Sequence, residues 1–312
     1  MSENKHIMTH WYTVIPSAIL CCLLWGSAFP CIKIGYKMFG IAADDNMSQL
    51  LFAGVRFTLA GIMVIIVGSI MQRKLLHPSP RALPKAAVLS LFQTVLQYTF
   101  FYLGLARTTG MKSSIITASN VFFAIIFSTL IFRHEKPSPK KIIGCIIGFA
   151  GVVIINLSSG EDLSFRLSGE GLILLSAASY GMSASFSKRF SKTEDPVMLS
   201  GYQFLMGGIA MTAFGVFSGG SIGHAGLSGA VMLGYLAFIS AAAFTVWGIL
   251  LKYNPVSRIS VFGFMNPVFG VILSAVLLSE SNSASPLRII ISLLLITIGI
   301  ITVNIQKSHS TP

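Results

Sequence analysis

Charge is scarce in this chain of 312 residues: only 10% are Asp, Glu, Lys or Arg, against about 25% in an average soluble domain. A soluble fold of this length needs a charged shell, and 22 basic and 10 acidic residues cannot supply one. Hydrophobic residues make up 54% of the chain, and its mean hydropathy is +0.78. These figures exclude a disordered chain and an ordinary soluble enzyme, and they indicate an integral membrane protein.

Acids and histidines are missing from the interior of the long apolar stretches, because all 10 acids and all 6 histidines lie in loops, tails or at the ends of those stretches. An intramembrane hydrolase needs paired acids, a metal cluster, or a nucleophile with a base. His134-Glu135 is followed by Lys136-Pro137, so there is no HExxH zinc helix. No GxxxxGK[ST] loop is present either. The sequence therefore predicts neither an enzyme, nor a metal, nor a cofactor, nor a carboxylate proton relay in the membrane.

Basic residues are in excess, and the net charge is +12. They do not cluster with aromatic residues on one soluble face, so we expect no nucleic-acid partner. They stand at the ends of apolar stretches, as the positive-inside rule requires. The four cysteines, Cys21, Cys22, Cys31 and Cys145, all lie within apolar stretches and suggest no disulfide or metal framework.

Ten apolar stretches are about as long as a bilayer-crossing helix, which needs about 20 residues. They lie near 12–36, 49–71, 85–106, 112–132, 140–157, 170–190, 197–217, 229–251, 258–279 and 286–305. Barrel strands run about 10 residues with alternating polarity, and these stretches are continuous. The expected fold is an all-α integral membrane protein with ten transmembrane helices.

The orientation of these spans follows from counting basic residues on the two sides. Fifteen of the 22 lie on the side that holds both termini, six lie on the other side, and Arg56 lies inside a span. The side with more Lys and Arg is the cytoplasmic one. We therefore expect both termini in the cytoplasm, with the protein in the cell (inner) membrane.

The two halves of the chain resemble each other. Trp25-Gly26 and Lys33 match Tyr180-Gly181 and Lys188 at an offset of 155, and Gly54-Val55-Arg56-Phe57 matches Gly201-Tyr202-Gln203-Phe204. Tyr102 and Glu135 match Trp247 and Glu280 at an offset of 145. We predict a first five-helix repeat over 12–157, a connector over 158–169 and a second repeat over 170–305. Since each half has an odd number of spans, the second enters from the opposite side, which is an arrangement common among secondary transporters.

At this point the chain resembles a known family, the EamA-type members of the drug/metabolite transporter superfamily. The residues that carry the resemblance are Trp25-Gly26-Ser27-Ala28-Phe29 with Lys33, Arg56-Phe57, Asn266-Pro267-Val268-Phe269, and the span-ending Glu135 and Glu280. The resemblance covers about 16–305 and implies a multispanning carrier, often an exporter of small metabolites. One departure is Phe122, which stands where the second half has Pro267. The fourth span is therefore expected to be straighter than the ninth.

Arg56 is the one charge inside a predicted span, and an arginine there costs roughly 2.5–3.5 kcal/mol on insertion scales. It can lower this cost by facing a wet cavity or by finding a partner. One interpretation is that its guanidinium binds an anionic or carboxylate group of the substrate. The other is a structural bond to carbonyls at helix ends.

Polar and aromatic residues at mid-span depth supply the other candidates. Gln93, Gln97 and Phe101 recur every four residues on one helix face, with Tyr102 nearby. This stripe either lines a pathway or bonds neighbouring helices. The mid-span aromatic residues, which we assign to a cavity, are Trp25, Tyr180 and Trp247. The mid-span amides are Asn120 and Asn266. The amides either act at a hinge or binding site or accompany a tolerated kink.

Two pairs of repeat mates lie near span ends. For Lys33 and Lys188 we expect snorkelling to the lipid headgroups. For Glu135 and Glu280 we expect bonds to rim groups or backbone amides, with coupling-ion handling as the alternative. Gly144, Gly148 and Gly151 form a small-residue face, which indicates close helix packing within the chain or in a homodimer.

The sequence thus predicts a secondary transporter that exports a small polar or amino-acid-like metabolite across the bilayer by alternating access. Its pathway residues are expected to be Trp25, Arg56, Gln93, Gln97, Tyr102, Asn120, Tyr180, Trp247 and Asn266. The alternatives are a passive channel or facilitator and, less favoured by the residues present, a membrane enzyme acting on lipid-linked groups. A sensor would need a soluble domain, and the loops hold none.

Overall fold

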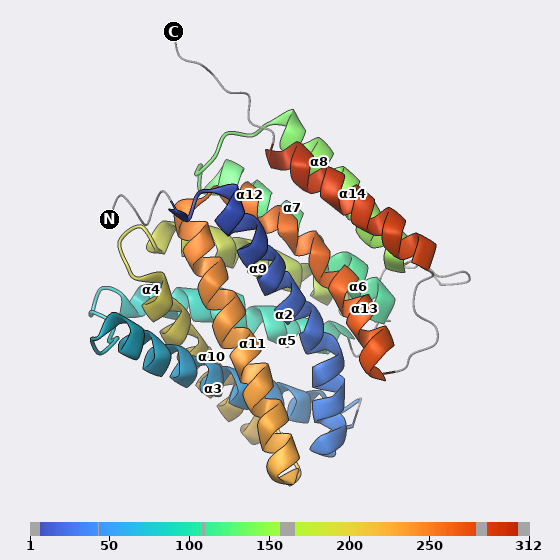
Figure 1. The fold of residues 1–312 in the computed structure, drawn as a ribbon. Helices are drawn as coiled ribbons and strands as arrows, with labels where there is room; N and C mark the ends of the chain where they lie inside the picture. Colours follow the sequence, from blue (N-terminus) through green and yellow to red (C-terminus); the bar gives the residue numbers. More distant parts are fainter. Residues whose placement is uncertain are drawn as a thin grey trace.

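The computed structural model describes residues 7–42, 44–105, 107, 110–156, 166–278 and 286–304, and every regular element in these ranges is a helix (Figure 1). The elements are α2 (Trp11–Met38), α3 (Asn46–Gln72), α4 (Leu83–Ser90), η1 (Leu91–Leu96), α5 (Gln97–Leu105), α6 (Gly110–Thr117), α7 (Asn120–Ile126), η2 (Phe127–Ile131), α8 (Pro139–Asn156), η3 (Leu167–Gly171), α9 (Leu172–Phe190), α10 (Pro196–Phe217), α11 (Gly226–Tyr253), α12 (Val256–Ser260), η4 (Val261–Phe264), α13 (Met265–Leu278) and α14 (Pro286–Asn304).

In each predicted repeat, a loop aspartate caps the N-terminus of the second helix. Asp45 caps α3 by accepting from Ser48 N at 3.0 Å. Asp195 caps α10 by accepting from Val197 N at 2.7 Å, and Pro196 occupies the first helical turn. An N-cap carboxylate satisfies amides that have no partner inside the helix. These hydrogen bonds from Ser48 also hold the pKa of Asp45 below its ordinary value.

The ten-span count is not confirmed. Each of the ten predicted stretches is largely helical where the structure describes it, and a turn at 118–119 interrupts the fourth. Within the part of the chain that the structure describes, seven helices are long and apolar enough to cross a membrane, and a shorter apolar helix covers Ile115–Ile131. The predicted sixth span, α9, is not among the seven. Its serines and the basic pair Lys188-Arg189 lower its hydropathy, and part of its surface packs against α5 and α7.

The first helix of each predicted repeat packs on the other repeat. α2 lies against α11 and α13, whereas α9 lies against α5 and α7. Two repeat mates show the same geometry, because a Cβ on Gly26 would lie 2.4 Å from Phe269 Cβ and one on Gly181 would lie 2.6 Å from Phe123 Cβ. Both helix contacts are therefore too close for any side chain larger than the hydrogen of glycine.

The remaining helices pair at two ends of the bundle. α3 lies along α10, and α8 lies along α14 at the opposite edge (Figure 1). A Cβ on Gly144 would lie 2.8 Å from Gly299 O, and one on Gly151 would lie 2.8 Å from Ser292 O. The predicted small-residue face is thus used for packing within the chain, against α14.

The fourth span is not straighter than the ninth, so this expectation is wrong. A turn separates α6 from α7, and Ser119 Oγ donates to Ile116 O at 2.6 Å in that turn. The ninth span narrows to a 3-10 turn, η4, at the matching place. In the fourth span the interruption occurs without a proline, and there a serine hydroxyl competes for a helix carbonyl.

The outer surface of the bundle is apolar. Ile70 is 71% exposed, Leu130 is 62% exposed and Leu294 is 58% exposed. Such side chains in a soluble protein would form a large hydrophobic surface patch. They are suited to contact with lipid, as expected of an integral membrane protein.

Candidate functional site

A chain of aromatic rings runs through the centre of the bundle and joins five predicted spans. Trp25 on α2 packs edge-on against both Trp247 and Phe244 of α11, with ring centroids 4.9 Å apart in each case. Phe244 contacts Phe204 of α10 at 5.0 Å, and Phe204 stacks on Phe57 of α3 at 5.4 Å. These contacts bring helices of both predicted repeats together at one core.

The chain of rings continues from Phe57 into the third predicted span. Phe57 contacts Tyr98 at 4.6 Å, and Tyr98 lies 6.3 Å from Tyr102 between centroids. Tyr180 of α9 packs against the same hydrophobic cluster. The structure therefore brings Trp25, Tyr102, Tyr180 and Trp247 together at one aromatic core, and their place on a substrate pathway stays a prediction.

Arg56 lies beside these rings and is only 3% exposed. Its guanidinium carbon is 4.4 Å from the Phe57 ring centroid and 5.7 Å from that of Tyr98. Ring faces carry a partial negative charge, so these contacts stabilise the cation. Its Nε has no hydrogen-bond partner among the described residues, although it is buried. The chain holds no acid between Asp45 and Glu135 that could neutralise it from the neighbouring spans.

The third predicted span contains a π-helical segment, η1, where the polar stripe was expected. A π turn changes the angular spacing of side chains, so Gln93 and Gln97 do not keep the four-residue alignment of a regular α-helix. The backbone carbonyl of Gln97 accepts from Ser176 Oγ of α9 at 2.7 Å. The side-chain Oε1 of Gln97 is buried without a partner. This span therefore offers one backbone link to α9 and one free side-chain acceptor.

A small cavity of about 10 Å³ lies between α4, η1, α9, α10 and α11. Gln93, Gln203 and Trp247 line it together with Ser187 and Ser200. A cavity of this volume holds about one water molecule. An organic substrate can therefore reach these residues only if the helices separate.

The two asparagines lie outside the aromatic core. A Cβ on Gly263 of η4 would lie 3.8 Å from Asn120 Oδ1. Asn266 Oδ1, at the start of α13, is buried without a partner. Asn120 thus faces η4, the helix interruption in the other repeat. This position suits a hinge better than a contact with a substrate bound at Arg56.

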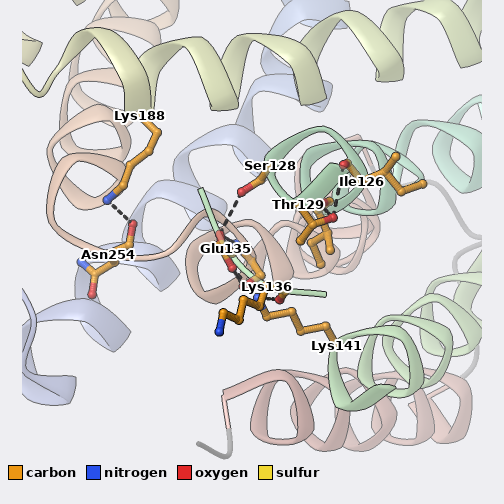
Figure 2. Close-up of polar contacts among 10 residues, drawn as sticks. Ile126, Ser128, Thr129, Glu135, Lys136, Lys141, Lys188 and Asn254 are labelled. Atoms are coloured by element: carbon orange, nitrogen blue, oxygen red, sulfur yellow. Dashed lines mark hydrogen bonds and ion pairs between the residues drawn. The ribbon is translucent and has the colours of Figure 1, made fainter. Parts of the chain in front are cut away.

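Glu135, in the loop before α8, makes a second polar cluster at one end of the bundle (Figure 2). It accepts from Lys141 Nζ at 2.6 Å and from Ser128 Oγ at 3.0 Å. It also accepts from both the backbone N, at 3.0 Å, and the hydroxyl of Ser257 at the start of α12. The predicted backbone-amide bond is confirmed for Glu135, while Glu280 lies outside the described residues.

Lys188 does not snorkel to headgroups, so this prediction is wrong. Its Nζ donates to Asn254 O at 2.7 Å (Figure 2). It also donates to Lys252 O at 2.9 Å, and both carbonyls lie at the end of α11. Those carbonyls have no partner inside their helix, and an ammonium there also complements the helix dipole. Lys188 thus binds the end of α11 and Glu135 binds the start of α12, so the two residues stabilise both sides of the turn between these helices.

Replacing Glu135 by Gln should lower the melting temperature at pH 7. Its carboxylate would lose charged hydrogen bonds, each contributing about 1.5–3 kcal/mol. Burial raises the pKa of Glu135, but the bonds from Lys141 and Ser257 outweigh burial and leave that pKa below its ordinary value. Its stabilising contribution is therefore complete above the unfolded-state pKa and is lost as pH falls through the folded-state pKa.

Melting curves of the wild type and Glu135→Gln between pH 3 and pH 8 measure this contribution. The two curves should differ most near neutral pH and converge at the acid end. A constant difference across the range would show that the carboxylate charge is not what stabilises the turn.

Several central residues were not among those predicted from the sequence. Gln203 is 1% exposed and accepts from Thr94 Oγ1 at 2.7 Å. Its position in the repeat was a usable signal, since it is the mate of Arg56. Phe204 and Phe244 are ordinary apolar residues in sequence, and no pattern separates them from core packing.

Comparison with known proteins agrees with this architecture. Relatives include an uncharacterized transporter of Archaeoglobus fulgidus, 27% identical over 84% of this chain and 88% of its own length. The uncharacterized inner membrane transporter YedA of Escherichia coli is 27% identical over 84% of this chain and 81% of its own length. The uncharacterized transporter YvbV of Bacillus subtilis is 26% identical over 91% of this chain and 89% of its own length.

A crystal structure shares the fold, with a TM-score of 0.76 and 17% sequence identity over 94% of this chain and 96% of the other. The profile of the EamA-like transporter family matches residues 13–157 and again 167–305. The two matches together cover most of the chain. This protein is a membrane transporter that belongs to the EamA-like transporter family.

Proposed function

We propose that this protein is a secondary transporter that exports a small, amino-acid-like metabolite by alternating access. The observation that carries the proposal is the position of Arg56. It is a buried cation with an unpartnered Nε, and it lies beside an aromatic core shared by both predicted repeats. Burial of a cation is unfavourable, so an anionic group of a substrate would be a stabilising partner.

The reciprocal packing of the predicted repeats supports alternating access. Each first helix, α2 or α9, packs on helices of the opposite repeat. Two repeats related in this way can rock against each other about a central site. The cavity beside Gln203 is too small for an organic substrate. Substrate entry therefore requires such a movement.

The amino-acid-like character of the substrate is proposed from Arg56 and from a polar group on the third predicted span. The guanidinium suits a carboxylate, and it lies over Tyr98. On the same span, Gln97 has a buried Oε1 without a partner among the described residues, and this oxygen can accept from an ammonium group. Aromatic rings nearby provide further favourable contacts for a cation. A zwitterion thus satisfies both the donor and the acceptor.

Counterflow in proteoliposomes tests this proposal against a passive channel. Vesicles are loaded with unlabelled amino acids and diluted into trace labelled amino acid, with empty vesicles and protein-free liposomes as controls. A carrier should accumulate label transiently, because loaded substrate returns the binding site to the outside. Equal uptake by loaded and empty vesicles would indicate a channel. Failure of a broad amino-acid panel to show any protein-dependent uptake would contradict an amino-acid-like substrate.

The proposed orientation places both termini in the cytoplasm. Reporter fusions after Pro312 and within the Arg73–Lys85 loop should be active on the cytoplasmic side, whereas a reporter within the 158–169 connector should be external. The basis of this expectation is the excess of basic residues on the side that holds both termini, because basic loops are retained in the cytoplasm. An external signal from the C-terminal fusion would contradict an even number of spans.

A further inference from the structure

We infer that Arg258, which stacks on the ring of Trp11, binds the phosphate of an anionic phospholipid at the edge of the bundle. Trp11 begins α2 and Arg258 lies in α12, where the first and the ninth predicted spans begin. The start of α2 and α12 lie at the same end of the bundle (Figure 1). The proposed orientation makes this end the cytoplasmic one. The site is on the surface of the protein, so it does not depend on the substrate proposed for Arg56.

Arg258 is half-buried and carries a charge that no acid in the described part of the chain neutralises. Its NH1 donates to Asn254 Oδ1 at 3.1 Å, which is an uncharged acceptor. Its Nε is buried and has no hydrogen-bond partner among the described residues. A cation that is partly removed from water and has one neutral acceptor is poorly compensated. An anion placed beside it would therefore be a stabilising partner.

Two contacts hold the guanidinium of Arg258 in place before an anion binds. Its central carbon lies 4.0 Å from the centroid of the Trp11 ring, so the ring covers one face of the guanidinium. Asn254, which accepts from Arg258, is fully buried and donates through Nδ2 to Met8 O at 2.9 Å. Stacking leaves the N–H groups at the edge of the guanidinium plane free to donate. Arginine binds phosphate through two such parallel hydrogen bonds.

The surface beside this guanidinium is suited to lipid. Trp11 is 41% exposed and Tyr12 is 69% exposed at the start of α2. Exposed aromatic rings at the end of a span are typical of the depth of the headgroups. Further along α2, Ile15, Leu20 and Leu23 are exposed on the same side of the helix. An anion bound here has an apolar helix surface next to it, which fits the acyl chains of a phospholipid better than a free ion.

The class of headgroup follows from the charges present. A phospholipid with a net negative charge, such as phosphatidylglycerol, brings one phosphate charge that Arg258 neutralises. The choline of a zwitterionic lipid would bring a second cation to the site, and no acid of the described residues contacts Arg258 to accept it. Anionic lipids are also the ones that attract basic residues at the cytoplasmic surface of a membrane. The site should therefore prefer an anionic headgroup to a zwitterionic one.

Lipid binding to the purified, delipidated full chain tests the inference. Phosphatidylglycerol and phosphatidylcholine with the same acyl chains are titrated into the detergent solution. The rise in melting temperature and the lipids retained in native mass spectra give the two affinities. The wild type should bind phosphatidylglycerol about tenfold or more tightly, the effect of one charged hydrogen bond. This preference should persist from about 0.15 M to about 1 M salt, because salt screens a partly buried ion pair less than an exposed one.

Variants separate this site from the general attraction of a basic surface for anionic lipid. Arg258→Gln keeps a donor for Asn254 but removes the charge, so it should reduce the preference to less than about threefold. Trp11→Leu keeps the charge but removes the stacked ring, so it should also lower the preference. Arg189→Gln is the matched control, because Arg189 is an exposed arginine at the end of α9 on the same predicted side of the membrane. It should leave the preference at the wild-type value.

Each outcome supports the site or overturns it. Loss of the preference in Arg258→Gln but not in Arg189→Gln supports it. Equal losses in these two variants, or a wild-type preference that disappears at high salt, indicate general electrostatic attraction and overturn it. Equal stabilisation by inorganic phosphate overturns the assignment to a lipid. If Arg258→Gln does not fold, Trp11→Leu decides, and an unchanged preference there overturns the site. These measurements involve no transport, so their failure leaves the proposed function intact.

Discussion

Substitution of Arg56 by Gln is expected to abolish measurable transport of zwitterionic substrates while the protein remains folded. Arg56 is buried beside Phe57 and Tyr98, and its Nε has no partner among the described residues. Loss of charged hydrogen bonds to a carboxylate should weaken binding about 30- to 100-fold, equivalent to about 2–3 kcal/mol. The amide is tolerated at the equivalent place in α10, where Gln203 stands.

Arg56→Lys is the second variant in this comparison. It retains the positive charge but loses the planar guanidinium, so it should also lose most of the transport. Transport and melting temperature are measured on one purified preparation, with an amino acid and its uncharged amide analogue as ligands. A selective loss for the carboxylate ligand supports substrate binding. Equal losses for both ligands, in proportion to a lower melting temperature, would leave Arg56 with a structural role.

Gly208→Ala should destabilise the protein more than any other single-methyl change in the interface between α3 and α10. A Cβ at position 208 would lie 2.3 Å from Thr58 N and 2.8 Å from Phe57 C, and both of these atoms belong to backbone. The two helices would have to separate. Overpacking of this kind costs about 1–3 kcal/mol or more. We expect the melting temperature to fall by several degrees and transport to fall with it, because Arg56 is displaced together with Phe57.

Gly234→Ala is the matched control for this prediction. Position 234 is also inside a helix, α11, but a Cβ there would meet no atom within 4 Å. Alanine should therefore be neutral or stabilising by up to about 1 kcal/mol, since it restricts the unfolded chain. The two variants are compared by thermal unfolding in the same detergent. Similar melting temperatures for both would contradict close packing of α3 on α10.

Much of the central site could be predicted from the sequence because unusual residue types mark it. A lone arginine in an apolar stretch is costly, so Arg56 could be identified without coordinates. The aromatic candidates could be identified because the repeat aligns Trp25 with Tyr180 and Tyr102 with Trp247. The apolar surface and the helical class follow from composition and run length, which the bilayer restricts directly.

Other features could not be derived from periodicity. The π turn at η1 and the interruption between α6 and α7 are changes in which backbone carbonyl accepts a given hydrogen bond. Such changes leave the spacing of apolar residues along the chain unaltered. The span count of ten is not confirmed, since among the described residues α9 is too polar to count as a span and packs in part against other helices. Lys188 has the same composition signal as a snorkelling lysine, yet its partners are carbonyls of α11.

The sequence by itself determined that this protein is a helical membrane transporter with two related halves and one buried arginine. Those properties follow from residue type and spacing along the chain, and burial in lipid leaves few alternatives. Only the tertiary structure decided which side chains meet: Arg56 with Tyr98, Gln203 with Thr94, and Glu135 with Ser257. These partners are distant in sequence, and their contacts depend on how closely glycines let particular helices approach, which no local pattern encodes.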